Sequence, residues 1–329
     1  METNKRGIIA IIVSLAILGV IVFISAGFGG ADLSAGEVIE AFKNPKELDV
    51  NSTIVLGMRV PRTIIAFFVG AMLAVSGALL QVVIKNPLGD PGITGISAGA
   101  SLFAVVIIFY FPSLLNFTPL FAFIGAVVAC LVVFSLSWKR GLDTTRIILA
   151  GIAVNAVFLG GTSLLTFMNG RKVQDAMQWL NGSVANKGWG DAKSIIIYGI
   201  IGIILSLFCI KAANILLLGD DVAKSIGVNV TLLRFLLGLV AVYLVGVSTA
   251  IAGVISFVGL IVPHTCRLIV GMNYKYVIPL SMILGAMLLV LTDMVGRTAF
   301  SPLEFPVGIL MAIIGSPVFL FLLKTKGKY

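Results

Sequence analysis

The chain has 329 residues, of which 59% are hydrophobic and only 11% charged, and its formal net charge is +9. Soluble globular domains carry about 25% charged residues, and a helix that crosses a bilayer needs roughly 20 apolar residues. The composition therefore excludes a secreted enzyme, a nucleic-acid-binding protein and a self-contained ATP-driven pump. It predicts an all-α, polytopic integral membrane protein with about ten transmembrane helices.

Predicted spans follow one another along the whole chain. The first apolar run, from Gly7 to Phe28, is longer than the core of about 7 to 15 residues in a cleavable signal, so we expect a retained helix. The run 232–270 predicts two helices that turn near Gly253, because a single helix would be about 60 Å long in a core of about 30 Å. Hydropathy places the spans near residues 8–28, 62–84, 93–111, 119–138, 146–168, 194–213, 232–252, 254–270, 277–296 and 306–323.

The basic residues predict how the chain is inserted. With the amino terminus inside, the inner segments hold 14 of the 23 Lys and Arg residues and a net charge of +9, whereas the outer segments balance to zero. Cytoplasmic segments of membrane proteins carry such an excess of Lys and Arg. The charge therefore marks the cytoplasmic face and indicates no nucleic-acid partner.

Two outer segments, 29–61 and 169–193, are long enough to form surface helices. Ser34, followed three residues later by Glu37, matches a capping box and favours a short helix over Ala35–Phe42. Ordinary connecting loops are the other interpretation of both segments.

Helix breakers are concentrated between residues 76 and 101. Asn86-Pro87 and Asp90-Pro91-Gly92 predict a turn at the cytoplasmic face, and Gly95 with Gly99 forms a small-xxx-small pattern that lets helices approach closely. The segment is either a plain helix hairpin or part of a gate that lines a cavity.

A second informative inner segment covers residues 217–227. Asp221 in a first helical turn and Gly227 as a stop predict a short helix. This helix fits either a knob that docks on a soluble partner or a solvated loop.

Catalytic and nucleotide-binding motifs are absent from the sequence. It has no G-x-x-x-x-G-K-[ST] phosphate loop and no H-E-x-x-H pair, and its single histidine, His264, suggests no metal site. Asp293 is the exceptional ionisable residue within the spans. Arg297 one turn later favours a structural ion pair, with a proton site as the other interpretation. We therefore expect no catalytic residue, cofactor or metal, with an ion-coupled carrier as the competing class of transporter.

Several sequence runs together resemble a known transporter family. They are RVPRTIIAFFVGAMLAVSGALLQ, NPLGDPGITGISAGAS, MQWLNGS, GDDVAKSIGVNV, GVISFVGLIVPHTCRLIVG and LEFPVGILMAIIGSPVFLFLL. In this order they are similar to the iron-siderophore, haem and cobalamin permeases (FecCD-type) of type II ABC importers, over about residues 59–323. The resemblance implies a cobalamin-permease-like fold, with residues 1–329 as a single transmembrane permease domain and both termini in the cytoplasm.

The resemblance also implies partners and a substrate. Such an importer of the bacterial cytoplasmic membrane contains a second permease subunit, identical or similar, two cytoplasmic ATP-binding subunits and an extracytoplasmic substrate-binding protein or lipoprotein. The permease is then not an enzyme, because the ATP-binding subunits hydrolyse ATP. The expected substrate is an iron-siderophore complex of the ferric hydroxamate or catecholate type, with haem and cobalamin as alternatives.

Family roles map onto three groups of residues, and the fifth and tenth spans are expected to line the pathway. The groups are Arg59, Arg62 and Arg297 for docking of the binding protein; Asn86, Leu88, Thr144 and Thr145 for the cytoplasmic gate; and Asp221, Ala223 and Gly227 for coupling to the ATPase.

Overall fold

A computed structural model describes residues 2–27, 29, 33–43, 49–92, 94–138, 142–170, 173–299 and 303–325. Over these residues the chain is helical and forms no strand, so the predicted all-α class is confirmed. The elements are α1 (Glu2–Gly27), α2 (Ala35–Lys43), α3 (Val50–Ser52), the π-helix η1 (Thr53–Arg59), α4 (Val60–Ile84), α5 (Ile96–Tyr110), the 3₁₀-helix η2 (Pro112–Phe117), α6 (Thr118–Ser137), α7 (Thr144–Met168), α8 (Val173–Leu180), α9 (Trp189–Leu217), α10 (Asp220–Ser225), α11 (Val230–Ala252), α12 (Val258–Val270), α13 (Tyr274–Thr298) and α14 (Val307–Thr325).

The predicted spans correspond to helices of the structure. Among the described residues, seven helices are long and apolar enough to cross a membrane, and α5, α12 and α14 are shorter apolar helices. Each coincides with one predicted span to within a few residues. The carboxyl-terminal residues 326–329, predicted to be cytoplasmic, lie outside the described part of the chain.

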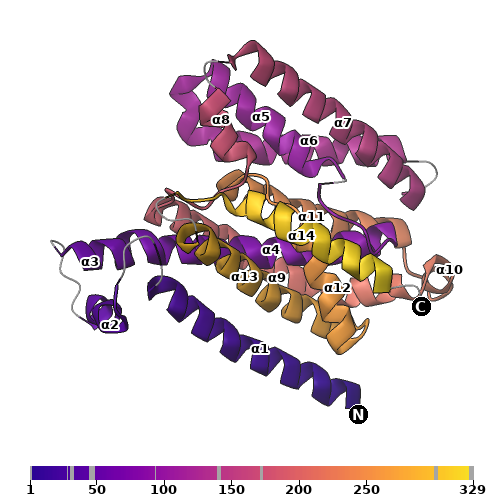
Figure 1. Cartoon of the computed structure of the whole chain (residues 1–329). Coiled ribbons are helices and arrows are strands. Elements are labelled where there is room, and N and C mark those ends of the chain that lie inside the picture. Colours follow the sequence, from indigo (N-terminus) through magenta and orange to yellow (C-terminus); the bar gives the residue numbers. More distant parts are fainter. Residues whose placement is uncertain are drawn as a thin grey trace.

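Helix α4 forms the centre of the molecule. Almost all of its residues are buried, because α9, α11, α12 and α13 pack around it. Figure 1 shows α1 along one edge, beside α13, and α5, α6 and α7 as a second group on the other side. Contacts between α6 and α11 join the two groups.

Glycine pairs allow the closest helix contacts. A Cβ atom at Gly99 of α5 would lie 2.4 Å from the carbonyl oxygen of Gly125 in α6, and one at Gly70 of α4 would lie 2.2 Å from that of Gly285 in α13. The close packing predicted for Gly99 is therefore confirmed. Gly95 instead takes a positive φ of 78° immediately before α5.

The predicted turn near Gly253 is also confirmed. Helix α11 ends at Ala252, Gly253 has a φ of 72°, and α12 begins at Val258. The carbonyl oxygen of Ala252 accepts a hydrogen bond from the backbone N–H of Ser183 at 2.7 Å. Backbone between two spans is tolerated inside a membrane protein when other parts of the protein satisfy it in this way.

Both long outer segments contain surface helices, α2 and α8. The capping box is present, since the backbone N–H of Ser34 donates to Glu37 Oε2 at 2.7 Å and the backbone N–H of Glu37 donates to Ser34 Oγ at 3.3 Å. The hydroxyl of Ser34 also donates to Glu37 Oε2 at 2.7 Å, and this bond, together with that from the Ser34 backbone N–H, holds the pKa of Glu37 below its ordinary value. The sequence did not predict that α3 and η1 extend α4 outward without a break.

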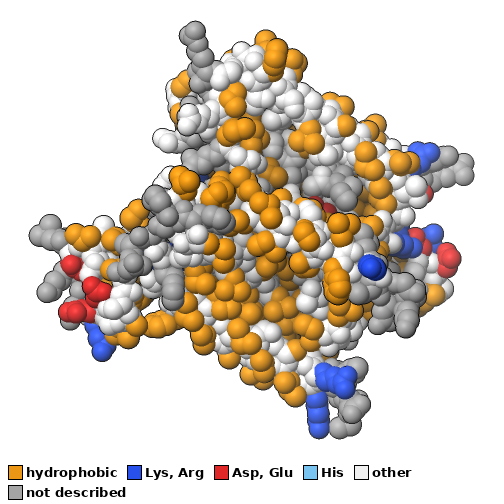
Figure 2. Space-filling view, in the orientation of Figure 1, with side chains coloured by type: hydrophobic (Ala, Val, Ile, Leu, Met, Phe, Trp, Pro, Cys, Tyr) orange, Lys and Arg blue, Asp and Glu red, His pale blue; other side chains and the backbone are white. Residues whose placement is uncertain are grey.

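Charged side chains gather at the two ends of the molecule. Figure 2 shows hydrophobic side chains across the middle of the visible face, acidic ones near α2 and α3, basic ones near the start of α1, and both basic and acidic ones around α10. This distribution fits a chain that crosses a bilayer, with α2 and α3 on one side and α10 on the other.

Candidate functional site

Arg62 links three elements at the outer end of the molecule. Its Nε donates to Asp293 Oδ1 at 2.9 Å and Oδ2 at 3.2 Å, and its Nη1 donates to Glu304 Oε2 at 2.7 Å. Asp293 is buried on α13, whereas Glu304 is 46% exposed in the segment before α14. The predicted ion pair between Asp293 and Arg297 is present at 3.5 Å, but Arg62 is the closer partner of this carboxylate.

The other two arginines of this group lie deeper than the resemblance implies. Arg59 is 5% exposed and Arg297 is 3% exposed. Nη2 of Arg297 donates to the carbonyl oxygen and the Oγ of Ser25, and Nη1 of Arg59 donates to the carbonyl oxygens of Ala26 and Gly27. The end of α1 has unpaired carbonyls that attract these groups. Within the described residues, Nη1 of Arg297 has no hydrogen-bond partner.

These positions leave the docking role of the three arginines a prediction. All three lie at the end predicted to be extracytoplasmic, and Arg62 pairs with the exposed carboxylate of Glu304. The burial of a residue depends on which distant helix covers it, and no local sequence signal predicted that α1 covers Arg59 and Arg297.

Two of the predicted gate residues, Asn86 and Leu88, lie on the loop between α4 and α5, which we call the gate loop, and form a tight turn there. Lys85 ends α4 with a left-handed φ of 54°. Asn86 Oδ1 then accepts a hydrogen bond from the backbone N–H of Leu88 at 2.9 Å, and the N–H of Gly89 donates to the carbonyl oxygen of Asn86 at 3.0 Å. Asn86 and Leu88 are half-buried. Such an Asx turn fixes the loop without a regular element.

The other predicted gate residues begin α7. Asp143 caps this helix through a 2.9 Å hydrogen bond from the backbone N–H of Arg146 to its Oδ1. Thr144 is half-buried and Thr145 is exposed. The structure therefore places both pairs of gate residues at the predicted cytoplasmic end, and their gating role stays a prediction.

The gate loop contains a buried acid, Asp90, for which the sequence predicted only a place in a turn. Its Oδ1 accepts a hydrogen bond from the backbone N–H of Gly92 at 2.8 Å, and the residue is 6% exposed. Burial raises the pKa of Asp90 to about 6, although the hydrogen bond from Gly92 opposes this shift. The position of an acidic residue between two closely spaced apolar spans was the sequence signal that could have predicted its burial.

The predicted coupling segment folds as the short helix α10. Within this helix Ala223 is buried and Asp221 is exposed in the first turn. Gly227 follows the helix with a φ of 81°. Val222 and Ile226 are 49% and 58% exposed. The predicted helix is confirmed, and its exposed apolar side chains provide a surface that a partner can cover.

Asp220, which was not among the predicted site residues, fixes α10 to the rest of the inner face. Its Oδ1 lies 2.7 Å from Lys85 Nζ and 2.7 Å from Arg234 Nη2. Nη1 of Arg234 also donates to the carbonyl oxygen of Leu142 at 3.1 Å. Partial burial raises the pKa of Asp220, but its bonds to Lys85 and Arg234 outweigh this effect, so the pKa lies below its ordinary value. The network joins α10 to the loop that carries Asn86.

The two helices expected to line the pathway expose apolar faces. On α7, Val157 and Phe167 are 71% and 87% exposed, and on α14, Ile313 and Phe321 are 63% and 67% exposed. Neither Ile147–Met168 nor Val307–Phe321 contains an Asp, Glu, Lys or Arg. These faces are uncharged and are not covered by other described helices of the chain.

Comparison with known proteins identifies the family. Residues 17–325 match the FecCD transport family. The chain belongs to this family. The FecCD permease is 39% identical to the Fe(3+)-citrate import system permease protein YfmD of Bacillus subtilis, over 95% of this chain and 94% of that protein. It is 37% identical to the iron(3+)-hydroxamate import system permease protein FhuB of Bacillus subtilis, over 97% of this chain and 84% of that protein.

A haem-related protein and a solved structure are also similar to the FecCD permease. The probable heme-iron transport system permease protein IsdF of Staphylococcus aureus is 35% identical over 98% of this chain and 97% of that protein. A solved structure described as an inward-facing conformation of a metal-chelate type ABC transporter has a TM-score of 0.86 at 30% identity, covering 96% of this chain and 98% of that one.

The resemblance found in the sequence is therefore confirmed. The FecCD permease is a multi-pass protein of the bacterial cell membrane and a transport permease of the ABC importer class. Its helices, with α4 at the centre and α7 and α14 exposed, form the membrane part of such a transporter.

Proposed function

We propose that the FecCD permease carries a ferric siderophore complex, of the hydroxamate or catecholate type, inward across the cytoplasmic membrane. The similarity to citrate and hydroxamate permeases supports an iron chelate as the substrate. The uncharged faces of α7 and α14 are a second observation that supports an iron chelate as the substrate. A hydroxamate complex, in which the ligand charges neutralise the ferric ion, passes such faces without burying an unpaired charge.

A second permease subunit completes the pathway in this proposal. The faces of α7 and α14 from both subunits enclose a passage whose apolar walls bind the substrate weakly, so that it is released rather than trapped. Two partner ATPases rest on α10, and ATP binding and hydrolysis move the gate loop through the network around Asp220. A substrate-binding protein docks at the outer end, near Arg62.

Uptake into vesicles tests the proposal. The permease is reconstituted with its partner ATPase inside and its binding protein outside, and accumulation of radioactive iron is measured with a ferric hydroxamate. We expect uptake that needs ATP and the binding protein and that stops with a hydrolysis-deficient ATPase. Uptake driven by a proton or sodium gradient without ATP contradicts the proposal and supports an ion-coupled carrier.

Haem is the second candidate substrate, because IsdF is nearly as similar to this chain as the iron-chelate permeases are. Cobalamin is a further alternative within the same family resemblance. Titrating the purified binding protein with a ferric hydroxamate, a ferric catecholate, haem and a corrinoid, while following its tryptophan fluorescence, separates these substrates. Quenching by haem or a corrinoid alone contradicts the siderophore assignment.

A further inference from the structure

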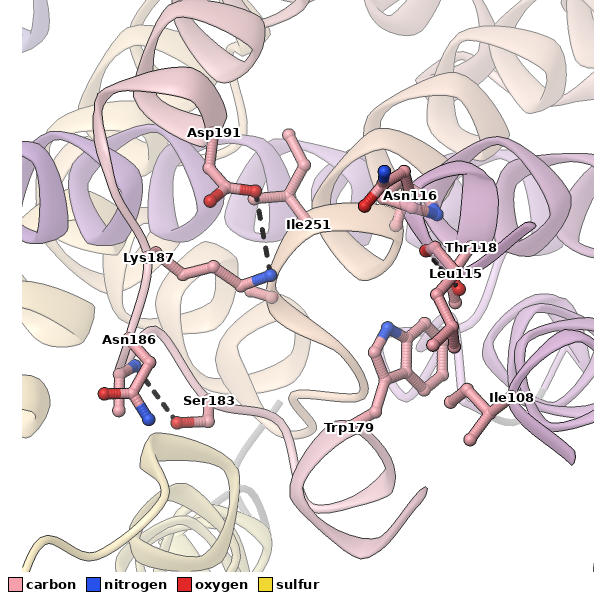
Figure 3. Close-up of a pocket in the computed structure, with 14 residues that line it drawn as sticks. Ile108, Leu115, Asn116, Thr118, Trp179, Ser183, Asn186, Lys187, Asp191 and Ile251 are labelled. Carbon is pink, nitrogen blue, oxygen red and sulfur yellow. Dashed lines mark hydrogen bonds and ion pairs between the residues drawn. The ribbon is translucent and has the colours of Figure 1, made fainter. Parts of the chain in front are cut away.

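A polar cavity of about 400 Å³ opens at the outer ends of α6, α9 and α11. Figure 3 shows Lys187 and Asp191 on one side of this space, and Asn116, Thr118 and the indole of Trp179 on the other. None of its described lining residues belongs to α7 or α14, so the cavity lies apart from the proposed pathway.

One ion pair, between Lys187 and Asp191, lies in the cavity. Lys187 Nζ lies 3.7 Å from Asp191 Oδ1, and both side chains are partly exposed. Asp191 is also engaged by its own helix, because its Oδ2 accepts a hydrogen bond from the backbone N–H of Gly188 at 3.3 Å. A long, partly exposed ion pair neutralises the ammonium incompletely. The cavity is thus suited to a phosphate at Lys187, with the hydroxyl or amine of a headgroup near Asp191.

An apolar groove lies on the same helices, nearer to the middle of the membrane than this cavity. Helix α11 packs against both α6 and α9 and forms the floor between them. A second cavity, of about 180 Å³, lies along α6 and α11 and is apolar apart from one phenol group; it is lined by Phe123, Val127, Cys130, Leu131, Leu239, Val242 and Tyr243.

The groove and the polar cavity share one face of α6. Pro119 lines the polar cavity, and Phe123, Val127 and Leu131 follow it at intervals of four residues, which places them on one side of a helix. At 1.5 Å per residue this row is about 18 Å long. Half of a bilayer core measures about 15 Å, so the row has the length of one acyl chain.

We propose that the cavity and the groove together hold one glycerophospholipid of the outer leaflet, with its phosphate at Lys187 and an acyl chain along α6 and α11. The level of the cavity supports this occupant, because it lies where three membrane-spanning helices end. Trp179 has the mixed polar and apolar character of side chains at the membrane surface. The charge of Lys187 matches the phosphate, and the apolar row matches the chain.

Native mass spectrometry of the full-length permease in detergent, titrated with dioleoyl phosphatidylglycerol, tests the site. We expect one saturable lipid adduct in the wild-type protein. Lys187→Gln should weaken its binding about tenfold, because the charge-assisted hydrogen bond to the phosphate is lost, and Lys187→Arg should restore it. Leu239→Trp should weaken it by filling the groove.

Matched controls separate the site from general effects. Lys193, an exposed lysine on the same helix as Asp191, and Leu236, exposed one turn from Leu239, do not line either cavity. Lys193→Gln and Leu236→Trp should bind the lipid as the wild-type protein does. Thermal unfolding of every variant shows whether it is folded.

Three results would overturn the proposal. One is unchanged lipid binding by a folded Lys187→Gln variant. Another is unchanged binding by a folded Leu239→Trp variant, because this result would show that the acyl chain does not lie in the groove. The third is displacement of the lipid by inorganic phosphate or glycerol phosphate at concentrations similar to those of the lipid, which assigns the cavity to a soluble anion.

Discussion

Arg62 is the outer arginine whose environment best fits contact with an acidic partner. It pairs with Glu304 at the surface as well as with buried Asp293, so an incoming carboxylate can exchange with Glu304. We expect Arg62→Glu to slow association of the binding protein about tenfold at low ionic strength and less at high salt, because charges at an interface rim act mainly on the association rate. Surface plasmon resonance with the permease in nanodiscs measures this rate.

Two controls accompany this substitution. Lys193→Glu reverses an exposed charge at the same end of the molecule, and Arg62→Lys keeps the positive charge. Both should retain near-normal association. An unchanged rate for Arg62→Glu would remove Arg62 from the docking surface.

The ion pair between Lys85 and Asp220 joins α10 to the gate loop, since Asn86 follows Lys85 directly. Lys85 is 38% exposed, so the pair adds about 1 kcal/mol or less to stability. We expect Lys85→Ala to leave thermal stability and ATP hydrolysis almost unchanged but to lower uptake several-fold. Lys85→Arg should keep uptake, and Lys224→Ala, at an exposed lysine of α10, is the matched control. A parallel loss of hydrolysis and uptake contradicts a role in coupling.

Asp90 makes stability depend on pH in a defined direction. Its pKa is about 6 in the folded chain, against an ordinary value of 3.8. Between these values the folded chain binds more protons than the unfolded chain, so stability falls as the pH rises from about 4 to 6 and then levels off. The full effect is on the order of 3 kcal/mol.

Asp90→Asn should therefore raise the unfolding temperature at pH 7.5 and change it little at about pH 4, because the amide keeps the hydrogen bond from Gly92 without a charge. Heating with a thiol-reactive fluorophore measures unfolding, since Cys130, Cys209 and Cys266 are buried. Asp221→Asn, at an exposed position, should show no such pH difference. Equal shifts at both pH values would contradict the assignment.

At the scale of the elements, apolar runs and local capping signals carried most of the information. The ten spans, the α2 capping box, the turn at Gly253 and the short α10 all depend on residues close in sequence, and all were predicted. The π-helix η1 was not, because it contacts parts of the chain that are distant in sequence, namely α1 and Trp189, whose Nε1 donates to the carbonyl oxygen of Leu56. Burial of Arg59 and the lysine partner of Asp220 were missed for the same reason.

Helix α10 should bind the ATPase mainly through its apolar side. Val222 and Ile226 expose about half of their surface on a six-residue helix, and burying such side chains contributes about 1.5 to 3 kcal/mol each. We expect the double variant Val222→Ser and Ile226→Ser to lose at least tenfold in ATPase affinity while unfolding at a normal temperature. Co-purification and titration of the ATPase measure this. Met177→Ser, on the outer helix α8, is the control, and full ATPase binding by the double variant would exclude α10 as the contact.

At the scale of the whole molecule, the packed helices α4 and α11 each contain an arginine that forms an ion pair, one at the outer end and one at the inner end. Arg62 lies near the start of α4 and binds Asp293 at the outer end, whereas Arg234 lies near the start of α11 and binds Asp220 at the inner end. Fourteen residues after each arginine lies a fully buried serine, Ser76 or Ser248. Because α4 and α11 pack together and run in opposite directions in the predicted topology, this arrangement is typical of inverted repeats in transporters.

The exposed faces of α7 and α9 should differ in their contact with water once the transporter is assembled. Val157 lies near the middle of α7 and is 71% exposed, and Ile204 lies near the middle of α9 and is 48% exposed. If two copies of α7 and α14 enclose the pathway, Val157 faces an aqueous cavity and Ile204 faces lipid. Thiols react as thiolates, which form readily in water and poorly in hydrocarbon.

We therefore expect Val157→Cys and Ile313→Cys to be labelled by a water-soluble maleimide in membranes containing the complete importer, and Ile204→Cys to be labelled at least about tenfold more slowly. The wild-type protein sets the background, because Cys130, Cys209 and Cys266 are buried. Adding ATP should change labelling at Val157→Cys as the pathway alternates, but not at Ile204→Cys. Equal labelling of α7 and α9 would place the pathway elsewhere, and slow labelling of Val157→Cys would mean that lipid covers α7.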